Sequence, residues 1–392
     1  MVEKYSDDKE RHSSWLENFY DLIAAIVVSQ LIVGLNQDVS ISSYIAFVIL
    51  FVPVWWSWLG VTFYNTRFET DDLGHRLLTL FQMAAAAFMA VNVIDGLGKN
   101  SSGFAISYAA IRAFLVFEYL RTGKRIPAAR SLTSLYSKGF LIAASIWFVS
   151  AFVPKPIRFI LWAAGLVLDI ITPLIFTRRL SMRFAPHIYH LPERFGSFTI
   201  IVLGISILGF VDGIATHNWT SQSVLSAGLG LTIAFCIWWI YFDSIDGSAI
   251  RAFRKDRRLG VYFAWLYIHF PLLIGLTGFG VSIEHVVLSD QSLPLLTSDK
   301  WLMGGSISLC LFSLAIIHIT SMKSKSKISI SEYSSEKNQA IFGIAGAAST
   351  LLFTAVAKDL LPLISILVVA VVCAGQVALD IKRHPHHRIF NL

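Results

Sequence analysis

The segment WLENFYDLIAAIVVSQLIVGLN, residues 15–36, decides the class of protein to which this chain belongs. A run of about 20 predominantly apolar residues is long enough to cross a bilayer as an α-helix. It is far too long for a barrel strand, and it shows no sustained period of two. We therefore predict a transmembrane helix at 15–36.

The same pattern recurs along the whole chain. Apolar residues make up 55% of the 392 positions, charged residues make up only 15%, and the mean hydropathy is +0.64. A soluble protein would carry nearer a quarter of charged residues. The sequence predicts an all-α integral membrane protein with about twelve transmembrane helices. The eleven further spans are expected at 42–64, 75–95, 102–120, 136–153, 157–177, 196–212, 222–242, 260–286, 301–320, 339–357 and 360–380.

The distribution of Lys and Arg tests this count, because cytoplasmic loops carry an excess of both. With the N-terminus inside, the predicted cytoplasmic segments hold 26 of the 32 Lys and Arg residues. The opposite side holds Lys99, Lys155, Arg158, Lys300 and Lys358. One missed span would scramble this alternation, so we predict that both termini are cytoplasmic.

The linkers divide the chain into two halves of six spans. We expect a cytoplasmic N-terminal segment, a first half, a cytoplasmic linker, a second half and a basic cytoplasmic tail, at 1–14, 15–177, 178–195, 196–380 and 381–392.

A weak internal similarity relates the two halves. Glu17 begins the first span and Glu193 precedes the seventh, while Trp-Trp pairs lie at 55–56 and 238–239. Six is an even number, so the halves would share their orientation, as in parallel transporter repeats. Chance similarity among apolar helices is the alternative.

Two carboxylates interrupt the first span. Glu17 and Asp21 are four residues apart, so both lie on one helix face near its cytoplasmic end. Two like charges held close together in a poor dielectric favour protonation of one of them, which is how a proton site is made. The alternative is a cap at the cytoplasmic end of the bundle, bridged to Arg67 or Arg76. Both interpretations stay open.

Two further charges lie deep in the spans. Arg112 is about midway along 102–120, and Asp169 lies in the inner half of 157–177. Their similar depths predict a buried ion pair. Such a pair can serve only to let two charges exist in a bundle, but ionisable groups in a membrane are also functional candidates by default. The second half offers Glu193, at a cytoplasmic end.

The sequence contains no recognisable motif of an enzyme or a metal site. It has no Walker loop, dinucleotide fingerprint, GxSxG elbow or zinc-protease motif. Cys236, Cys310 and Cys373 each lie inside an apolar run and are too far apart for a metal motif. The basic residues lie in loops rather than on one stripe. We therefore expect no cofactor, no metal and no nucleic-acid partner.

Five segments in the same order make the chain resemble the bacterial low temperature requirement protein A (LtrA) family. They are WLENFYDLIAAIVVSQL, VPVWWSWLGVTFYNTRFETDDLGHRLL, LPERFGSFTIIVLGISIL, IWWIYFD and YIHFPLLIGL, between Trp15 and about Leu276. The resemblance implies a polytopic protein of the bacterial cytoplasmic (inner) membrane, in a family linked by name to growth in the cold. One departure is Ile205, which occupies the position where the family's seventh span typically has a glutamate.

We interpret the chain as a transporter of a small solute or ion with proton coupling, and we expect no enzyme activity. Its partners would be the lipid bilayer and the solute, and a homo-oligomer stays open. The acids would be coupling sites, and the arginines would be counter-ions or anion ligands. The candidate residues are Glu17, Asp21, Arg67, Arg112, Asp169 and Glu193.

Two alternatives belong to other functional classes. One is a membrane-embedded enzyme acting on a lipid or isoprenoid carrier, which would need clustered ionisable groups facing one leaflet. The residues that keep it open are Glu17, Asp21, Arg67, Asp71 and Asp72. The other is a non-catalytic membrane sensor or assembly factor.

Overall fold

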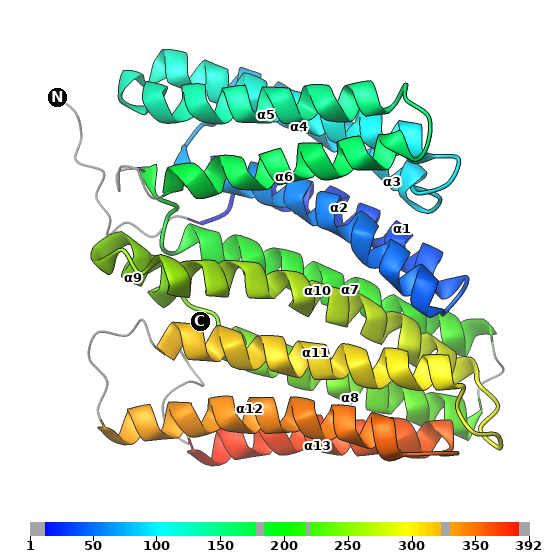
Figure 1. Ribbon diagram of the computed structural model, residues 1–392. Helices are drawn as coiled ribbons and strands as arrows, with labels where there is room; N and C mark the ends of the chain where they lie inside the picture. The colour runs from blue at the N-terminus through cyan, green and yellow to red at the C-terminus, as the bar shows by residue number, and fades with distance from the viewer. Residues whose placement is uncertain (1–11, 178–183, 217–219, 323–329, 384–392) are drawn as a thin grey trace. The chain divides into compact units, whose positions relative to one another are not determined.

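The computed structural model describes residues 12–177, 184–216, 220–322 and 330–383 of the chain (Figure 1). These residues form helices and connecting turns, with no strand among them. The first-half helices are α1 (Trp15–Asn36), α2 (Ile41–Arg67), α3 (Leu73–Val93), α4 (Ser101–Arg125), α5 (Arg130–Ser150) and α6 (Ile157–Thr177), with a 3₁₀ turn at Pro127–Ala129 before α5. The later ones are α7 (His190–Thr216), α8 (Ser221–Ser244), α9 (Ser248–Asp256), α10 (Leu259–Leu288), α11 (Thr297–Met322), α12 (Ile330–Val356) and α13 (Pro362–Arg383).

Twelve helices of the described residues are long and apolar enough to cross a membrane. Each of them contains most of one predicted span, so the predicted fold class is confirmed. The largest shift is at α12, which begins at Ile330 rather than 339, and α7 begins at His190 rather than 196. Both helices extend into polar sequence because backbone hydrogen bonding continues beyond the apolar run. The parallel repeat and the cytoplasmic termini stay predictions.

Helix α9 is the element that the sequence analysis missed, because it read residues 243–259 as a loop. The segment SAIRAFRKD buries Ala249, Ile250 and Phe253 and exposes Arg251. Apolar residues at this spacing mark an amphipathic helix. The signal was present, but nine residues are too short to stand out beside spans of twenty.

Contacts between Cα atoms divide the chain into two compact units. Unit 1 contains residues 1–37 and 42–198, and unit 2 contains residues 38–41 and 199–392. The division falls inside α7, so the first turns of that helix belong to unit 1. The charged side chains at the start of α7 therefore pack with α1 and α2.

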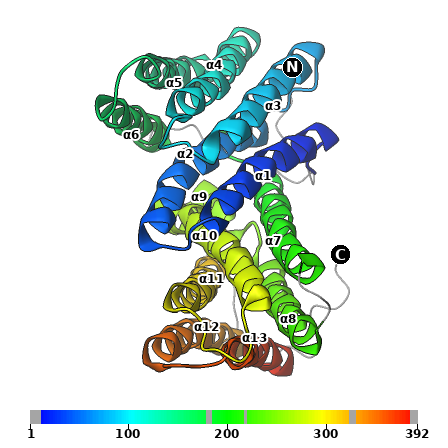
Figure 2. The ribbon, with the colours of Figure 1, turned by 90° about the vertical axis from the view of Figure 1, so that its right-hand side faces the viewer.

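In unit 1, α4 packs closely against both α3 and α5, while α5 also packs against α6 and α3 against α1 (Figures 1 and 2). Helix α2 contacts its neighbours through large aromatic side chains. The ring of Trp58 lies 5.1 Å from that of Phe195, and the ring of Tyr64 lies 5.2 Å from that of Tyr119. Large aromatic side chains therefore surround the middle and the end of α2 in unit 1.

In unit 2, α11 packs closely between α10 and α12, and α13 packs against α8 (Figure 2). The described part of α7 in this unit meets α10 at small residues. The Ser206 hydroxyl donates to the Leu276 carbonyl at 2.9 Å, and a Cβ at Gly280 would lie 2.8 Å from the Ser206 Cα. Small residues allow such close approach between membrane helices.

Large apolar side chains also lie on the outside of the helices. Phe88, Leu141, Ile160, Leu208 and Leu352 are among those that are exposed. A soluble monomer rarely exposes so many, whereas lipid tails are as apolar as these side chains. The outer surface therefore fits a lipid bilayer.

Three of the five cations that the sequence analysis placed on the minority side hydrogen-bond to backbone carbonyls. Lys155 donates to the carbonyls of Leu97 and Gly98 at 2.8 and 2.6 Å, and Lys300 donates to that of Ala357 at 2.8 Å. Arg158 donates to the carbonyl of Ser150, the last residue of α5, at 3.1 Å. Carbonyls near helix ends lack intrahelical partners, so these exceptions to the charge rule have a structural role.

Candidate functional site

The buried polar groups of unit 1 include a ladder of two acid–base pairs between α1 and α7. Glu17 Oε2 lies 2.7 Å from His190 Nε2, and Asp21 Oδ1 accepts a hydrogen bond of 2.6 Å from Arg194 Nη2. Each helix contributes its two residues at a spacing of four, which places them on one face. The two acids of α1 therefore match the two basic residues of α7 turn by turn.

The ladder is shielded from solvent. Asp21, His190 and Arg194 are each 0% exposed, and Glu17 is 5% exposed. The indole of Trp58 on α2 donates a second hydrogen bond of 2.6 Å to Asp21 Oδ1. A charged group in such a setting must be paired, because an isolated buried charge costs several kcal/mol.

The start of α1 positions its first acid. Ser14 is the N-cap, and its hydroxyl accepts a hydrogen bond of 3.3 Å from the Glu17 backbone N–H. The Glu17 carboxylate accepts one of 3.1 Å from the Ser14 backbone N–H, which completes a capping box. The same Oε2 atom faces His190, so the cap that begins the helix also orients the site.

The expected partners of the acid pair were wrong, because Arg67 and Arg76 were proposed and His190 and Arg194 are found. The sequence analysis placed both of the actual partners in a cytoplasmic linker. The signal that was overlooked is HLPER at the start of α7, where His190 and Arg194 share a helix face. Sequence pattern alone does not pair two helices more than 170 positions apart.

The predicted Arg112–Asp169 ion pair is present. Arg112 Nε donates to Asp169 Oδ2 at 2.8 Å, and both side chains are 0% exposed. Tyr108 donates to the same oxygen at 2.5 Å, and Arg112 Nη2 donates to the Trp56 carbonyl at 3.2 Å. The pair thus ties α4 to α6 and α2.

A glycine on α2 makes room for this guanidinium. A Cβ at Gly60 would lie 2.2 Å from Arg112 Nη1, so only glycine fits at that position with Arg112 in place. Arg112 donates to the Trp56 carbonyl and Asp21 accepts from the Trp58 indole, so both buried pairs lie against the same stretch of α2. The two buried arginines therefore belong to one charged region of unit 1.

The other two candidate residues, Arg67 and Glu193, have different contacts. The Arg67 guanidinium is buried over the rings of Phe63 and Tyr136, 5.1 and 5.2 Å from their centroids. Glu193 is partly exposed, and it accepts a hydrogen bond of 3.1 Å from the Ser13 backbone. The same carboxylate oxygen, Oε2, lies 3.6 Å from His12 Nδ1.

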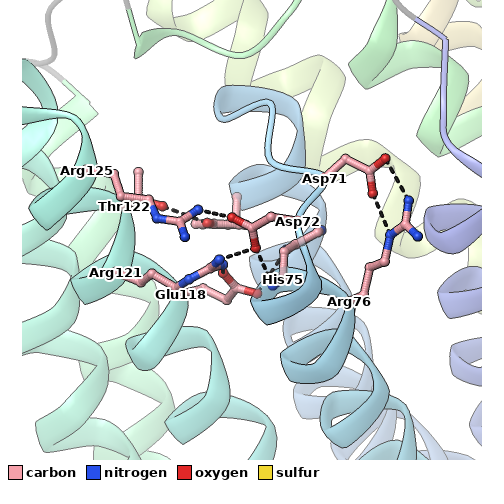
Figure 3. Close-up of polar contacts among 9 residues, drawn as sticks. Asp71, Asp72, His75, Arg76, Glu118, Arg121, Thr122 and Arg125 are labelled. Carbon is pink, nitrogen blue, oxygen red and sulfur yellow. Dashed lines mark hydrogen bonds and ion pairs between the residues drawn. The ribbon is translucent and has the colours of Figure 1, made fainter.

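A second polar cluster lies where α3 and α4 meet (Figure 3). Asp72 is the N-cap of α3, and its carboxylate accepts hydrogen bonds from Arg121 and Arg125 on α4. One turn into α3, His75 Nδ1 lies 2.9 Å from Glu118 Oε1, and both side chains are buried. This cluster joins the start of α3 to the end of α4. Each of the three acids labelled in Figure 3, Asp71, Asp72 and Glu118, has a basic side chain beside it.

Asp71 lies beside this cluster and is well exposed. It accepts hydrogen bonds of 2.8 and 2.9 Å from Arg76. Hydrogen bonding to the Arg76 guanidinium holds the pKa of the Asp71 carboxyl below its usual range. This pair is a surface feature, so we use Asp71 below as a control position.

Unit 2 contains an amphipathic pocket that sequence reasoning missed. Four helices, α8, α11, α12 and α13, contribute its lining. Gln339 donates to Asp380 at 2.6 Å, and Gln376 donates to the Phe342 carbonyl at 3.0 Å. The polar residues come from four helices that are separated in sequence, so periodicity could not group them.

His269, near the middle of α10, is fully buried. Its Nδ1 donates to the Trp265 carbonyl at 2.7 Å, and its ring lies 5.8 Å from that of Tyr241. In the part of the chain that the structure describes, no group of three His, Cys, Asp or Glu side chains could hold a metal ion.

Comparison with known proteins relates the chain to a protein family and to a bacterial relative. A family model described as bacterial low temperature requirement A protein (LtrA) matches residues 12–377, nearly the whole chain. The uncharacterized protein RA0937 of Rhizobium meliloti (strain 1021) is 24% identical over 324 residues, which cover 76% of this chain and 78% of that protein. The range matched by the family model includes the ladder residues of α1 and α7.

Proposed function

Because the chain belongs to the bacterial low temperature requirement A protein (LtrA) family, and because its apolar helices fit a bilayer, we propose that it is a proton-coupled transporter of a small solute or ion. Its location would be the bacterial cytoplasmic membrane. We assign it no bond-making reaction. The observation that carries the proposal is the Asp21–Arg194 pair, buried between α1, α2 and α7.

The cost of this pair favours a functional role. Each ionisable group inside a span costs about 2.5–3.5 kcal/mol on insertion scales. A buried ion pair can often be replaced by apolar residues at no loss of stability. Four ionisable groups on two adjoining helix faces therefore need a reason beyond stability, and reversible protonation supplies one.

The geometry also leaves one oxygen of the Asp21 carboxylate free to take up a proton. Asp21 Oδ1 accepts both of the hydrogen bonds that hold the carboxylate, from Trp58 and Arg194. The other oxygen, Oδ2, has no hydrogen-bond partner among the described residues. Protonation at Oδ2 would leave the side chain in position, and Glu17 with His190 lies one turn away as a second exchange site.

The test measures proton movement in proteoliposomes that contain a pH-sensitive dye. Sodium salts of small organic acids, amino acids and metal chlorides are added outside in turn. We expect at least one solute to change the internal pH faster than in protein-free liposomes. Asp21→Asn should abolish that change, because the amide is nearly isosteric but cannot take up the proton.

Asp71→Asn is the matched control, since it makes the same change at an exposed carboxylate outside the spans. It should leave proton movement unchanged. Size-exclusion profiles establish that each variant is folded. Unaltered proton movement in a folded double variant, Asp21→Asn with Glu17→Gln, would contradict the proposal.

A further inference from the structure

The guanidinium of Arg194 has more N–H donors than its neighbours supply acceptors. Its Nη2 donates to Asp21 Oδ1, whereas Nε and Nη1 have no acceptor among the described residues. The side chain is 0% exposed. An unsatisfied buried donor costs about 1–3 kcal/mol, and more when it is charged. Arg194 can therefore gain by binding a further anionic acceptor.

Asp21 is the present counter-ion of Arg194, and protonation would remove it. The neutral acid would still accept the Trp58 hydrogen bond at Oδ1, but it would no longer balance the positive charge. A fully buried arginine cannot lose its own proton, because the guanidinium stays charged in proteins. Protonation of Asp21 therefore leaves a buried cation that needs another anion.

The groups around Asp21 are known on each element packed against it. Helix α1 itself carries Glu17 and Tyr20, and α7 carries His190 and Arg194. Helix α2 contributes the indole of Trp58. Arg112 on α4 is paired with Asp169.

Helix α3 also packs against α1. Its two titratable side chains have partners elsewhere, since His75 pairs with Glu118 and Arg76 pairs with Asp71. Arg194 is thus the cation that donates a hydrogen bond to Asp21. Among the described residues, no second cation contacts the Asp21 carboxylate.

We propose that Arg194 is the binding site for a small monovalent anion, which replaces ionised Asp21 as the counter-ion when Asp21 is protonated. This inference rests on the proposed proton-coupled transport and names its substrate class. The anion must be compact, because Asp21, His190 and Arg194 are all closed off from solvent. It would accept hydrogen bonds from Nε and Nη1 of Arg194.

The charges balance in this scheme. One proton adds to Asp21 Oδ2, and one monovalent anion binds to Arg194, so the net charge of the site does not change. Proton and anion would then cross together in a one-to-one ratio. By linkage, the proton raises the affinity for the anion by the same factor as the anion raises the affinity for the proton.

The test measures anion binding to the purified full-length protein in detergent, without chloride. Sodium nitrate is the probe, because it stays ionised throughout the pH range, and sodium gluconate is the bulky reference salt. Thermal stability is followed against nitrate concentration, since a ligand that binds the folded state raises Tm. We expect the wild-type affinity for nitrate to strengthen as pH falls, by up to about tenfold per pH unit.

Asp21→Asn provides the decisive variant. Because the amide mimics the protonated acid, we expect nitrate to bind this variant with the same affinity at all pH values. At about pH 8.5 the variant should bind nitrate about tenfold tighter than the wild type, or more. Arg194→Gln should lose the nitrate response, whereas Arg158→Gln, which changes a cation elsewhere in unit 1, should keep it.

The outcomes separate this inference from the proposed function. An Asp21→Asn protein without a nitrate response, or a wild type that binds nitrate more tightly as pH rises, would overturn the anion site even if proton movement in liposomes is normal. Nitrate binding that depends on pH, in a protein that moves no protons, would support the anion site and overturn proton-coupled transport. The Asp21→Asn result decides the question even if Arg194→Gln fails to fold.

Discussion

At the scale of single residues, the two buried arginines of unit 1 differ in how fully their neighbours satisfy them. Arg112 donates to Asp169, Tyr108 and the Trp56 carbonyl. Arg194 donates to a single oxygen of Asp21. Arg112 is held by three groups on three helices, so we interpret its pair as structural. Arg194 is held by one, so we interpret it as the exchangeable cation.

This interpretation predicts how the Arg112–Asp169 pair responds to substitution. Arg112→Ala should reduce the yield of folded protein, because removal of one partner from a buried pair costs about 3–5 kcal/mol. The double variant with Asp169→Ala should recover part of that yield, since no buried charge is left alone. Size-exclusion chromatography of detergent extracts measures both, and additive losses would show that the two residues act independently.

Gly60 gives a second prediction at this scale. Gly60→Ala should destabilise the protein by about 1–3 kcal/mol, because the new methyl group overlaps the Arg112 guanidinium in a filled interior. Gly204→Ala is the matched control, since a Cβ at Gly204 meets nothing within 4 Å. Thermal unfolding in detergent measures both variants. Equal Tm values for the two would mean that Arg112 moves aside without cost.

At the scale of helices, the α1–α7 ladder combines two local rules. A spacing of four places Glu17 and Asp21 on one face of α1, and it places His190 and Arg194 on one face of α7. Each rule was readable from its own segment. The match between the two faces depends on α7 beginning at His190, six residues before the apolar run expected at 196.

The helix ends of unit 1 also carry a prediction. Arg158 donates to the Ser150 and Ala151 carbonyls and to the Ser101 hydroxyl, so it joins the end of α5 to the start of α4. Arg158→Ala should lower Tm, because partly buried carbonyls lose charged donors, each worth about 1.5–3 kcal/mol. Lys99→Ala, on the same predicted side, should leave Tm unchanged, because the Lys99 side chain is exposed. A Tm loss of the same size at Lys99 would point to a general charge effect.

At the scale of the whole molecule, the distribution of charge predicts topology. Because 26 of the 32 cations lie in segments assigned to one side, reporter fusions after Lys124 and Lys255 should be cytoplasmic. Fusions after Lys99 and Lys300 should be periplasmic. Paired alkaline phosphatase and fluorescent-protein fusions read the two locations, and one reversed position would contradict the order of twelve spans.

The sequence by itself determined the class of fold and the approximate position of every long helix. Apolar runs of span length suffice for this, because a bilayer forces each run to satisfy its backbone hydrogen bonds within a helix. The buried Arg112–Asp169 pair was also readable, since both charges lie at similar depths in spans and a charge inside a membrane needs a partner.

Only the tertiary structure decided which charges meet at the candidate site. His190 and Arg194 lie in a polar stretch that reads as a linker, and their burial depends on packing of α7 against α1 and Trp58. Periodicity gives the face of a helix but not the helix that covers it. Arg67 is a second example. The sequence suggested that it bridges to the acids of α1, whereas its guanidinium lies over the aromatic rings of Phe63 and Tyr136.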